Sequence, residues 1–318
     1  MKKSFLLLFA CMLFIQCDLP ILREFPVGDT KLLSSDSRLF QGTTAWDLAK
    51  AVADDDSARV ERILQKHPEV IDIQEPRYGT TVLHQSVYWR RYKAFLALLR
   101  NGADVNIHIY SNGDSPLHEV FYHSRKDTTC LKYVEKLVEY GADVNDYGRA
   151  VGGLRFGIYH HYSFTPLMKA CASGRLDCVK FLVENGADIN MRFSPGITAL
   201  NDALIQGHYD IAIYLLEHGA DFRVPFMYQS RAEKSYVYDV DEKYDPVCLE
   251  EYISTLSDDD ISPEYRKRIL YLISQEFKEP SLSHWKRTKK QKQLIEKRIQ
   301  RYKKIEDQGL SYVYERCK

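Results

Sequence analysis

The sequence has no excess of charge of either sign, since its 44 Lys and Arg residues are balanced by 44 Asp and Glu residues. A neutral chain gives no reason to expect nucleic acid as the main partner. The sequence also lacks the Gly-x-x-x-x-Gly-Lys motif that cradles a phosphate, and no cysteine lies near a recognisable base or oxyanion motif. We therefore expect no enzymatic activity, no cofactor and no nucleic-acid partner.

Long apolar runs are scarce as well. The run over residues 4–15 follows two lysines, and it is too short for a stable transmembrane helix but typical of a secretory signal. Cys17 closes this run, which resembles a bacterial lipoprotein signal in which that cysteine is lipidated; an uncleaved or ordinary signal segment is the alternative. We expect residues 1–17 to be the signal. The protein would then be lipid-anchored in the bacterial cell envelope and face the periplasm, or be secreted if it is not lipidated.

Recognisable metal-binding patterns are missing too. The adjacent His160 and His161, with His108 elsewhere, have neither the i, i+4 spacing nor the Cys-x-x-Cys partners of a metal site, so we expect no bound metal. Two of the seven cysteines lie in the signal, and the other five cannot all pair: Cys130, Cys171, Cys178, Cys248 and Cys317. Cys171 and Cys178 are expected to be small buried apolar residues, with a disulfide between them as the alternative.

What the sequence does contain is a repeated motif, which residues 165–190 show most clearly. Thr165 is a helix N-cap and Pro166 suits the first helical position, where no N–H donor is needed. A tight turn follows near Gly174, and a second apolar-striped helix ends at Gly186, because glycine adopts the left-handed C′ conformation at little cost. Two helices this short cannot bury their apolar faces alone, so the unit requires neighbours.

The neighbours are visible in the sequence. Gly-Ala-Asp recurs at positions 102, 141, 186 and 219, and the helix-opening motif recurs at 81–84, 115–118, 165–168 and 198–201. A period near 33 with these signatures resembles the ankyrin repeat. The resemblance implies an all-α ankyrin-repeat solenoid, with hairpin fingers on one side, that binds other proteins. It also implies that His84 and His118 hydrogen-bond the motif hydroxyl and the adjoining turn rather than act in catalysis.

The signal over residues 1–17 is the first of four segments of the chain. We expect a linker over 18–43, about five repeats over 44–222 with a degenerate first repeat, and a helical C-terminal extension over 223–318 that caps the stack. Within the extension, 223–245 is Tyr-rich and irregular, a helix is expected from Asp245, and Ser262-Pro263-Glu264 is a strong helix start.

Partner recognition is expected at the inner helices and at the finger loops. The inner helices supply large side chains: Tyr88, Trp89, Arg90, Phe121 and Tyr122. The finger between Asn145 and Thr165 is longer than the finger between Asn190 and Thr198. The extra residues include types that dominate binding hot spots: Arg155, Phe156, Tyr159 and Tyr162. The alternative is a variable loop that packs its aromatic side chains on itself.

A basic segment over 286–304 has ten Lys and Arg residues against Glu296. It reads either as a solvated helix face or as a contact for anionic headgroups near the anchoring membrane. An acidic protein partner is a further option.

Together these features predict non-enzymatic protein–protein binding by an exported envelope protein. From the resemblance, some bacterial ankyrin lipoproteins act as immunity proteins that block secreted effectors. An envelope scaffold or adaptor that holds several endogenous proteins is the alternative.

Overall fold

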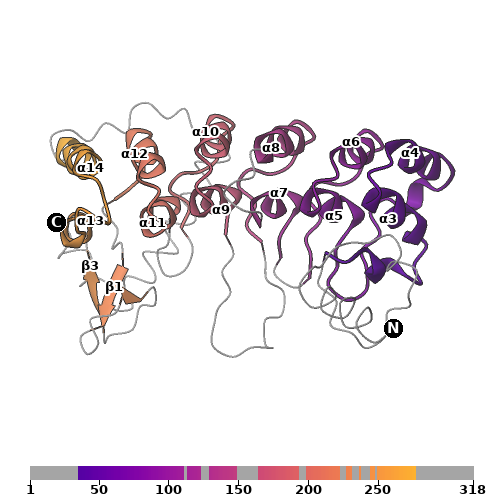
Figure 1. The fold of residues 1–318 in the computed structure, drawn as a ribbon, viewed down its shortest axis with the longest axis horizontal. Helices are drawn as coiled ribbons and strands as arrows, with labels where there is room; N and C mark the ends of the chain where they lie inside the picture. Colours follow the sequence, from indigo (N-terminus) through magenta and orange to yellow (C-terminus); the bar gives the residue numbers. More distant parts are fainter. Residues whose placement is uncertain are drawn as a thin grey trace, which may run out of the picture. The chain divides into compact units, whose positions relative to one another are not determined.

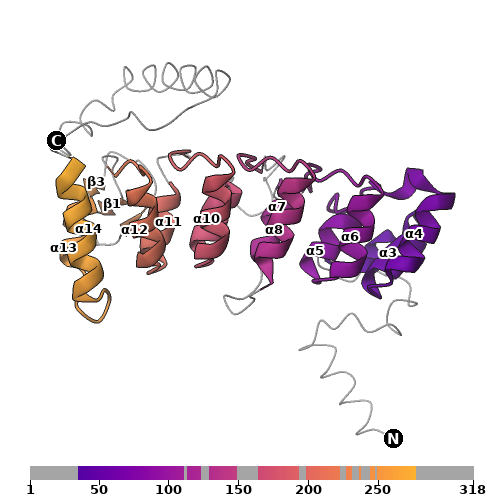
Figure 2. The ribbon, with the colours of Figure 1, turned by 90° about the horizontal axis from the view of Figure 1, so that it is seen from above.

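The computed structural model describes residues 35–110, 113–122, 129–148, 164–192, 198–222, 227–230, 236–237, 244–247 and 249–276. The chain divides into two compact units, Met1–Pro166 and Leu167–Lys318. Figure 1 shows the helix pairs of each unit, and Figure 2 shows them from above. Within the described ranges, every helix is too short or too polar to cross a membrane.

The described residues of unit 1 form three helix pairs, in each of which a short inner helix turns back into a longer outer helix. The pairs are α3 with α4, α5 with α6, and α7 with α8. Their bounds are α3 (Trp46–Ala53), α4 (Ser57–Lys66), α5 (Val82–Tyr88), α6 (Tyr92–Arg100), α7 (Pro116–Glu119) and α8 (Cys130–Glu139). Three short 3₁₀ helices accompany them: η1 (Ser37–Phe40), η2 (Pro68–Val70) and η3 (Val120–Tyr122).

Local sequence determines where these helices begin and end. Thr81 caps α5 in a capping box, because its hydroxyl accepts the N–H of His84 while the His84 side chain accepts the N–H of Thr81. Gly102 and Gly141 end α6 and α8 with φ values of +86° and +92°, where other residues are strained. The alanine after each glycine donates to the carbonyl five residues earlier, as in a Schellman motif.

The core of unit 1 is formed by apolar side chains between the inner and outer helices. Phe95 and Tyr133 are fully buried, with ring centroids 4.8 Å apart. Tyr92 stacks on Phe95 at 5.8 Å and meets Tyr133 edge to face at 5.1 Å. This aromatic contact joins α6 to α8 and therefore joins neighbouring repeats.

The predicted linker over 18–43 is wrong for its last part, because residues 35–43 are folded. Within η1, the side chains of Leu39 and Phe40 are buried and pack against α3. The Trp89 indole N–H donates to the carbonyl of Ser35 at 2.7 Å, and the Gln85 amide donates to the carbonyl of Asp36 at 3.1 Å. We call residues 35–43 the N-terminal arm. Its apolar side chains cover the first repeat, a role that the linker prediction did not consider.

Where unit 2 is described, it has two further helix pairs and a helical end. The pairs are α9 (Pro166–Ala172) with α10 (Leu176–Glu184), and α11 (Ala199–Ile205) with α12 (Tyr209–Glu217). The turns between the paired helices contain Gly174 and Gly207 at φ +71° and +72°. The predicted exit at Gly186 is confirmed, since Gly186 has φ +92° and Ala187 donates to the carbonyl of Leu182.

The segment after α12 differs from the expectation of an irregular stretch followed by a helix from Asp245. Three short antiparallel strands form a sheet in the order β2-β1-β3: β1 (Met227–Ser230), β2 (Tyr236–Val237) and β3 (Tyr244–Val247). Pro246 pairs with Tyr228 in this sheet. Because proline disfavours the helical conformation of the residue before it, Asp245 is extended and the helix starts later.

Two helices then close the end of unit 2. α13 (Leu249–Thr255) packs on α14 (Pro263–Glu276), and α14 packs along α12. Ile269 and Ile273 of α14 are buried, and Arg268 forms an ion pair with Glu217 of α12. The predicted helix start at Ser262-Pro263 and the capping role of this segment are both confirmed. The helix expected near 283–307 lies outside the described residues.

Candidate partner-binding surface

The inner helices α5 and α7 begin with a buried polar motif that links the second and third repeats of unit 1 to the finger that follows each of them. The Nδ1 atom of His84 lies 2.8 Å from the Thr81 hydroxyl, and its Nε2 atom lies 3.3 Å from the carbonyl of Asp114. His118 repeats the arrangement with Ser115 at 2.9 Å and the carbonyl of Phe164 at 2.7 Å. The structural role predicted for both histidines is confirmed.

The protonation state of His84 follows from its surroundings. Burial lowers the pKa of His84 to about 4, so the imidazole is neutral at neutral pH. A carbonyl can only accept, so Nε2 carries the proton and donates to Asp114, which leaves Nδ1 to accept from the N–H of Thr81. A neutral imidazole thus serves as a donor in one direction and as an acceptor in the other.

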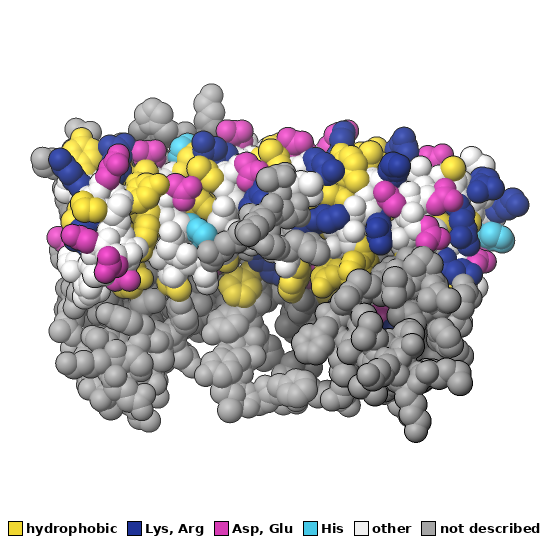
Figure 3. Space-filling model, in the orientation of Figure 1, with side chains coloured by type: hydrophobic (Ala, Val, Ile, Leu, Met, Phe, Trp, Pro, Cys, Tyr) yellow, Lys and Arg dark blue, Asp and Glu magenta, His cyan; other side chains and the backbone are white. Residues whose placement is uncertain are grey.

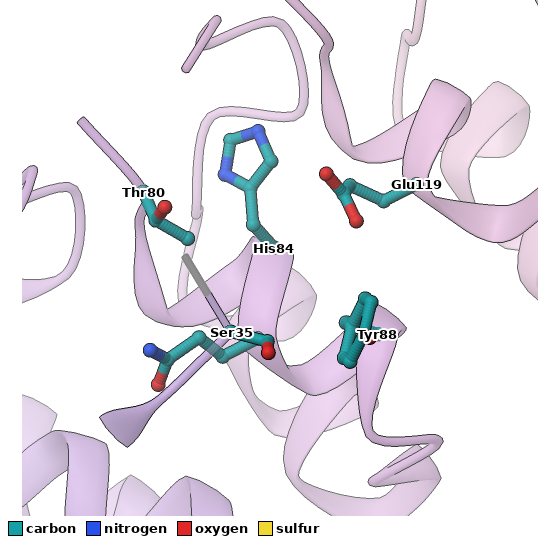
Figure 4. A pocket seen from close by; sticks show the side chains of 6 residues that line it. Ser35, Thr80, His84, Tyr88 and Glu119 are labelled. Atoms are coloured by element: carbon teal, nitrogen blue, oxygen red, sulfur yellow. The ribbon is translucent and has the colours of Figure 1, made fainter. Parts of the chain in front are cut away.

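A small pocket opens beside this motif, between the N-terminal arm, α5 and α7 (Figure 4). Its lining residues are Ser35, Thr80, His84, Gln85, Tyr88 and Glu119. In Figure 4 the side chains of His84 and Glu119 come from neighbouring helices and point into the same space.

Arg90 is a structural residue rather than the free binding residue that the sequence predicts. Its backbone has φ +56°, a conformation that Gly174 and Gly207 occupy in the corresponding turns of unit 2. Its guanidinium donates to the carbonyls of Val87 at 3.0 Å and Val120 at 2.6 Å, and it lies 5.2 Å from the ring centre of Tyr133. The side chain therefore ties the second repeat to the third.

The side chains of the other predicted inner-helix residues differ in how much of their surface is exposed. Phe121 is 7% exposed and belongs to the core, so its prediction as a partner contact is wrong. Trp89 is half-buried, holds the N-terminal arm and meets Tyr88 edge to face at 5.2 Å. Tyr122 is 51% exposed, and its hydroxyl donates to Asp114 at 2.8 Å, which fixes the ring at the surface. Of the five predicted side chains, Tyr122 is the one best placed to meet a partner.

Sequence reasoning missed Tyr110 and Tyr147, which are 51% and 38% exposed in unit 1. Tyr110 lies in the finger between Asn106 and Ser115, and its hydroxyl donates to Gln74. Its ring is so close to Gly79 that a Cβ at that glycine would lie 2.5 Å from the ring. Tyr110 lies four residues after Asn106 and Tyr147 lies two residues after Asn145, and this place after the Asn of the finger motif was the available signal. We refer to the three exposed tyrosines Tyr110, Tyr122 and Tyr147 together as the tyrosine face.

The outer side of unit 1 is different in character. Figure 3 shows Lys and Arg side chains interspersed with Asp and Glu over the outer helices. Arg100 of α6 and Glu61 of α4, for example, form an exposed ion pair at 3.1 Å. Such mixed charge is typical of a solvated surface and contributes little to stability.

In unit 2 the inner helix α11 carries Asp202. Part of this residue reaches the surface, but its Oδ2 atom is enclosed and accepts no hydrogen bond from any described residue. Burial raises the pKa of Asp202 to about 8. Burial, and to a lesser extent the charge of Asp202, raises the pKa of the Cys171 thiol. Cys171 and Cys178 are both buried and Cys171 forms no disulfide, as expected for small apolar residues.

Several predicted site residues lie outside the described residues. They are the lipidation site Cys17, the loop residues Arg155, Phe156, Tyr159 and Tyr162, and the basic segment 286–304. His160 and His161 also lie outside. His108 is described, and its Nε2 atom lies 2.9 Å from both carboxylate oxygens of Asp146.

Comparison with known families agrees with this geometry. The model of the family "Ankyrin repeats (3 copies)" matches residues 107–193 and 152–225. Residues 107–225 of this chain contain ankyrin repeats. The predicted fold class, an ankyrin-repeat solenoid of paired helices with a helical C-terminal cap, is confirmed: both units have the paired helices, the cap closes unit 2, and β1–β3 are an addition. Ankyrin repeats are typically non-enzymatic modules that bind other proteins.

One curated relative is similar over part of the chain. Alpha-latrocrustotoxin-Lt1a of Latrodectus tredecimguttatus is 30% identical over 134 residues, which cover 42% of this chain and 8% of the toxin. Because the chain spans so small a share of that protein, the similarity concerns a segment and not the activity of the whole toxin.

The buried histidine predicts a pH-dependent stability. The unfolded chain binds a proton at His84 below pH 6.5, whereas the folded chain does so only near pH 4. The stabilisation is therefore complete above pH 6.5 and is lost as the pH falls toward 4. Between pH 7 and 5, His84 should account for a loss of about 2 kcal/mol in the free energy of unfolding, measurable by urea titration.

A matched control is provided by α11, where Asn201 replaces the histidine and still accepts the N–H of Thr198 at 3.0 Å. His84→Asn should keep the helix cap but lose this share of the pH dependence, since an amide does not titrate. Equal losses of stability for the wild type and His84→Asn between pH 7 and 5 would show that the assignment is wrong.

Two variants distinguish the effect of the Arg90 side-chain contacts on stability from the effect of its backbone strain. Arg90→Ala should lower the free energy of unfolding by about 2 kcal/mol, because two hydrogen bonds and a ring contact are lost. Arg90→Gly loses the same contacts but tolerates the positive φ, so it should be about 1 kcal/mol less destabilising. Urea unfolding of both variants measures the difference, and a more stable Arg90→Ala would contradict the strain.

Proposed function

We propose that this protein is a non-enzymatic binder of the bacterial cell envelope that uses its inner helices and finger loops to hold a protein partner. The supporting observation is that the inner side of unit 1 already binds a polypeptide, because Gln85 and Trp89 hold two consecutive carbonyls of the N-terminal arm. The tyrosine face lies in the same unit. Exposed, hydrogen-bonded tyrosines supply large contact area at low entropic cost.

We further propose that the partner is a secreted antibacterial effector and that binding neutralises it, which makes the protein an immunity protein. Residues 1–17 support an exported lipoprotein with its acyl chains on Cys17. A tether at the periplasmic side of the membrane raises the local concentration of the inhibitor where an effector arrives. The basic segment 286–304 would add an electrostatic contact with anionic headgroups, worth about 1 kcal/mol for each Lys or Arg.

An envelope scaffold is the second candidate. Its support is the division into two compact units, since each unit has inner helices of its own and could hold a different partner. A scaffold and an inhibitor differ in the number and stoichiometry of their partners.

Affinity capture from envelope extracts distinguishes the two candidates. The immunity role predicts one stoichiometric partner, encoded by a neighbouring gene and inhibited when the complex forms. Several unrelated endogenous partners would favour the scaffold instead. Capture of no protein above the level seen with an unrelated lipoprotein would contradict both.

The lipid anchor has a separate test. Cells fed a radiolabelled fatty acid should label the wild-type protein, and Cys17→Ala should abolish the label and release the protein from membranes into the soluble periplasmic fraction. Equal labelling of the variant would exclude Cys17 as the lipidated residue.

The tyrosine face predicts the effect of a single substitution on affinity. Tyr122→Ala should weaken binding of the captured partner by more than about 1 kcal/mol, or roughly fivefold, because it removes an exposed anchor side chain. Tyr140→Ala is the matched control, since Tyr140 is 42% exposed at the end of the outer helix α8. Titration calorimetry measures both affinities, and equal weakening by the two variants would remove the tyrosine face from the interface.

A further inference from the structure

Asp202 of α11 occupies the same position in its repeat as Gln85 of α5. Each residue lies four positions after the capping threonine, Thr198 or Thr81, and each donates its backbone N–H to that threonine's carbonyl at 3.2 Å. The caps themselves are alike, since both helices begin with a capping box. The two side chains therefore leave equivalent points on their inner helices.

At this position in unit 1, the side chain binds a polypeptide. Gln85 and, one helical turn later, Trp89 donate hydrogen bonds to the carbonyls of Asp36 and Ser35 in the N-terminal arm. The equivalent pair in unit 2 is Asp202 and Gln206, and the N–H of Gln206 donates to the carbonyl of Asp202 just as that of Trp89 does to Gln85. The register that holds the arm in one unit is thus repeated in the other, with an acidic side chain in place of an amide.

One carboxylate oxygen of Asp202 has no hydrogen-bond partner among the described residues. This atom, Oδ2, is enclosed. A buried carboxylate without a partner is costly, and a positively charged donor is the group that compensates it best. The described residues of unit 2 therefore contain an acceptor that lacks a donor, in the register where unit 1 holds main chain.

We propose that α11 docks an extended polypeptide segment of the protein partner and that Asp202 receives a Lys or Arg side chain of that segment. This inference rests on the proposed protein-binding function and specifies the chemistry of the partner.

The test uses the full-length protein and a phage-displayed library of random linear peptides. Selection is carried out on the wild type, on Asp202→Asn and on Asp210→Asn, the last being a control because Asp210 is exposed on the outer helix α12. Peptides from the wild type and from Asp210→Asn should share a Lys or Arg at one aligned position, and this preference should vanish with Asp202→Asn. A selected peptide, labelled with a fluorophore, should bind Asp202→Asn about tenfold or more weakly.

Thermal unfolding at pH 7.5 checks the folded state of each variant. Asp202→Asn should melt at a higher temperature than the wild type, because an amide avoids burying an ionisable group without a partner, and Asp210→Asn should melt at the wild-type temperature. A lower melting temperature for Asp202→Asn would show that Asp202 already has a structural partner, and it would overturn the proposal.

Three outcomes of the selection would overturn it as well. They are an unchanged basic preference on Asp202→Asn, wild-type peptides that share no basic position, and no enriched peptide on the wild type. If envelope capture still yields a partner, the protein-binding function stands and the docking position at Asp202 alone is excluded.

Discussion

The structure of unit 1 depends on a buried, neutral imidazole that must satisfy two neighbours at once. His84 accepts from the cap of its own helix and donates to the carbonyl of Asp114 at the next finger, and His118 has equivalent contacts with Ser115 and Phe164. Because α5 and α7 are about two turns long or shorter, a cap of this kind fixes the residue at which each of them begins. The same interaction orients the inner helix, and with it every side chain on the inner side.

That orientation explains why one register of side chains recurs as a binding position. Gln85 holds the main chain of the N-terminal arm, Glu119 lines the adjoining pocket, and Asp202 has an acceptor atom without a donor. The core is formed by other positions of the inner helices, such as Leu83 and Val87 in α5. The side chains that would meet a partner and those that form the core therefore lie at different positions of the same short helices.

The sequence was sufficient to predict the helix pairs, their caps and their glycine exits, because these depend on contacts within a few residues. The role of both motif histidines was predicted from the family resemblance for the same reason. The folded arm could not be predicted, since Ser35 and Asp36 meet Trp89 and Gln85 across some fifty positions. Arg90 and Phe121 were taken for binding residues because their chemistry suits an interface, whereas a strained turn and the contact with Val120 place them in the fold.

The way in which the arm is held has a consequence for how this protein can change. Gln85 and Trp89 contact carbonyl oxygens, which every residue possesses, so the hydrogen bonds do not depend on the identity of Ser35 or Asp36. Particular side chains are required elsewhere in the arm: at the buried Leu39 and Phe40, at Asp36, whose carboxylate caps η1, and at Gly42, which has φ +81°. A substitution at Ser35 can therefore keep the hydrogen bond from Trp89, whereas a substitution at Asp36 keeps the hydrogen bond from Gln85 but removes the cap of η1. The bonds that anchor the arm thus tolerate changes of sequence that its own local structure does not.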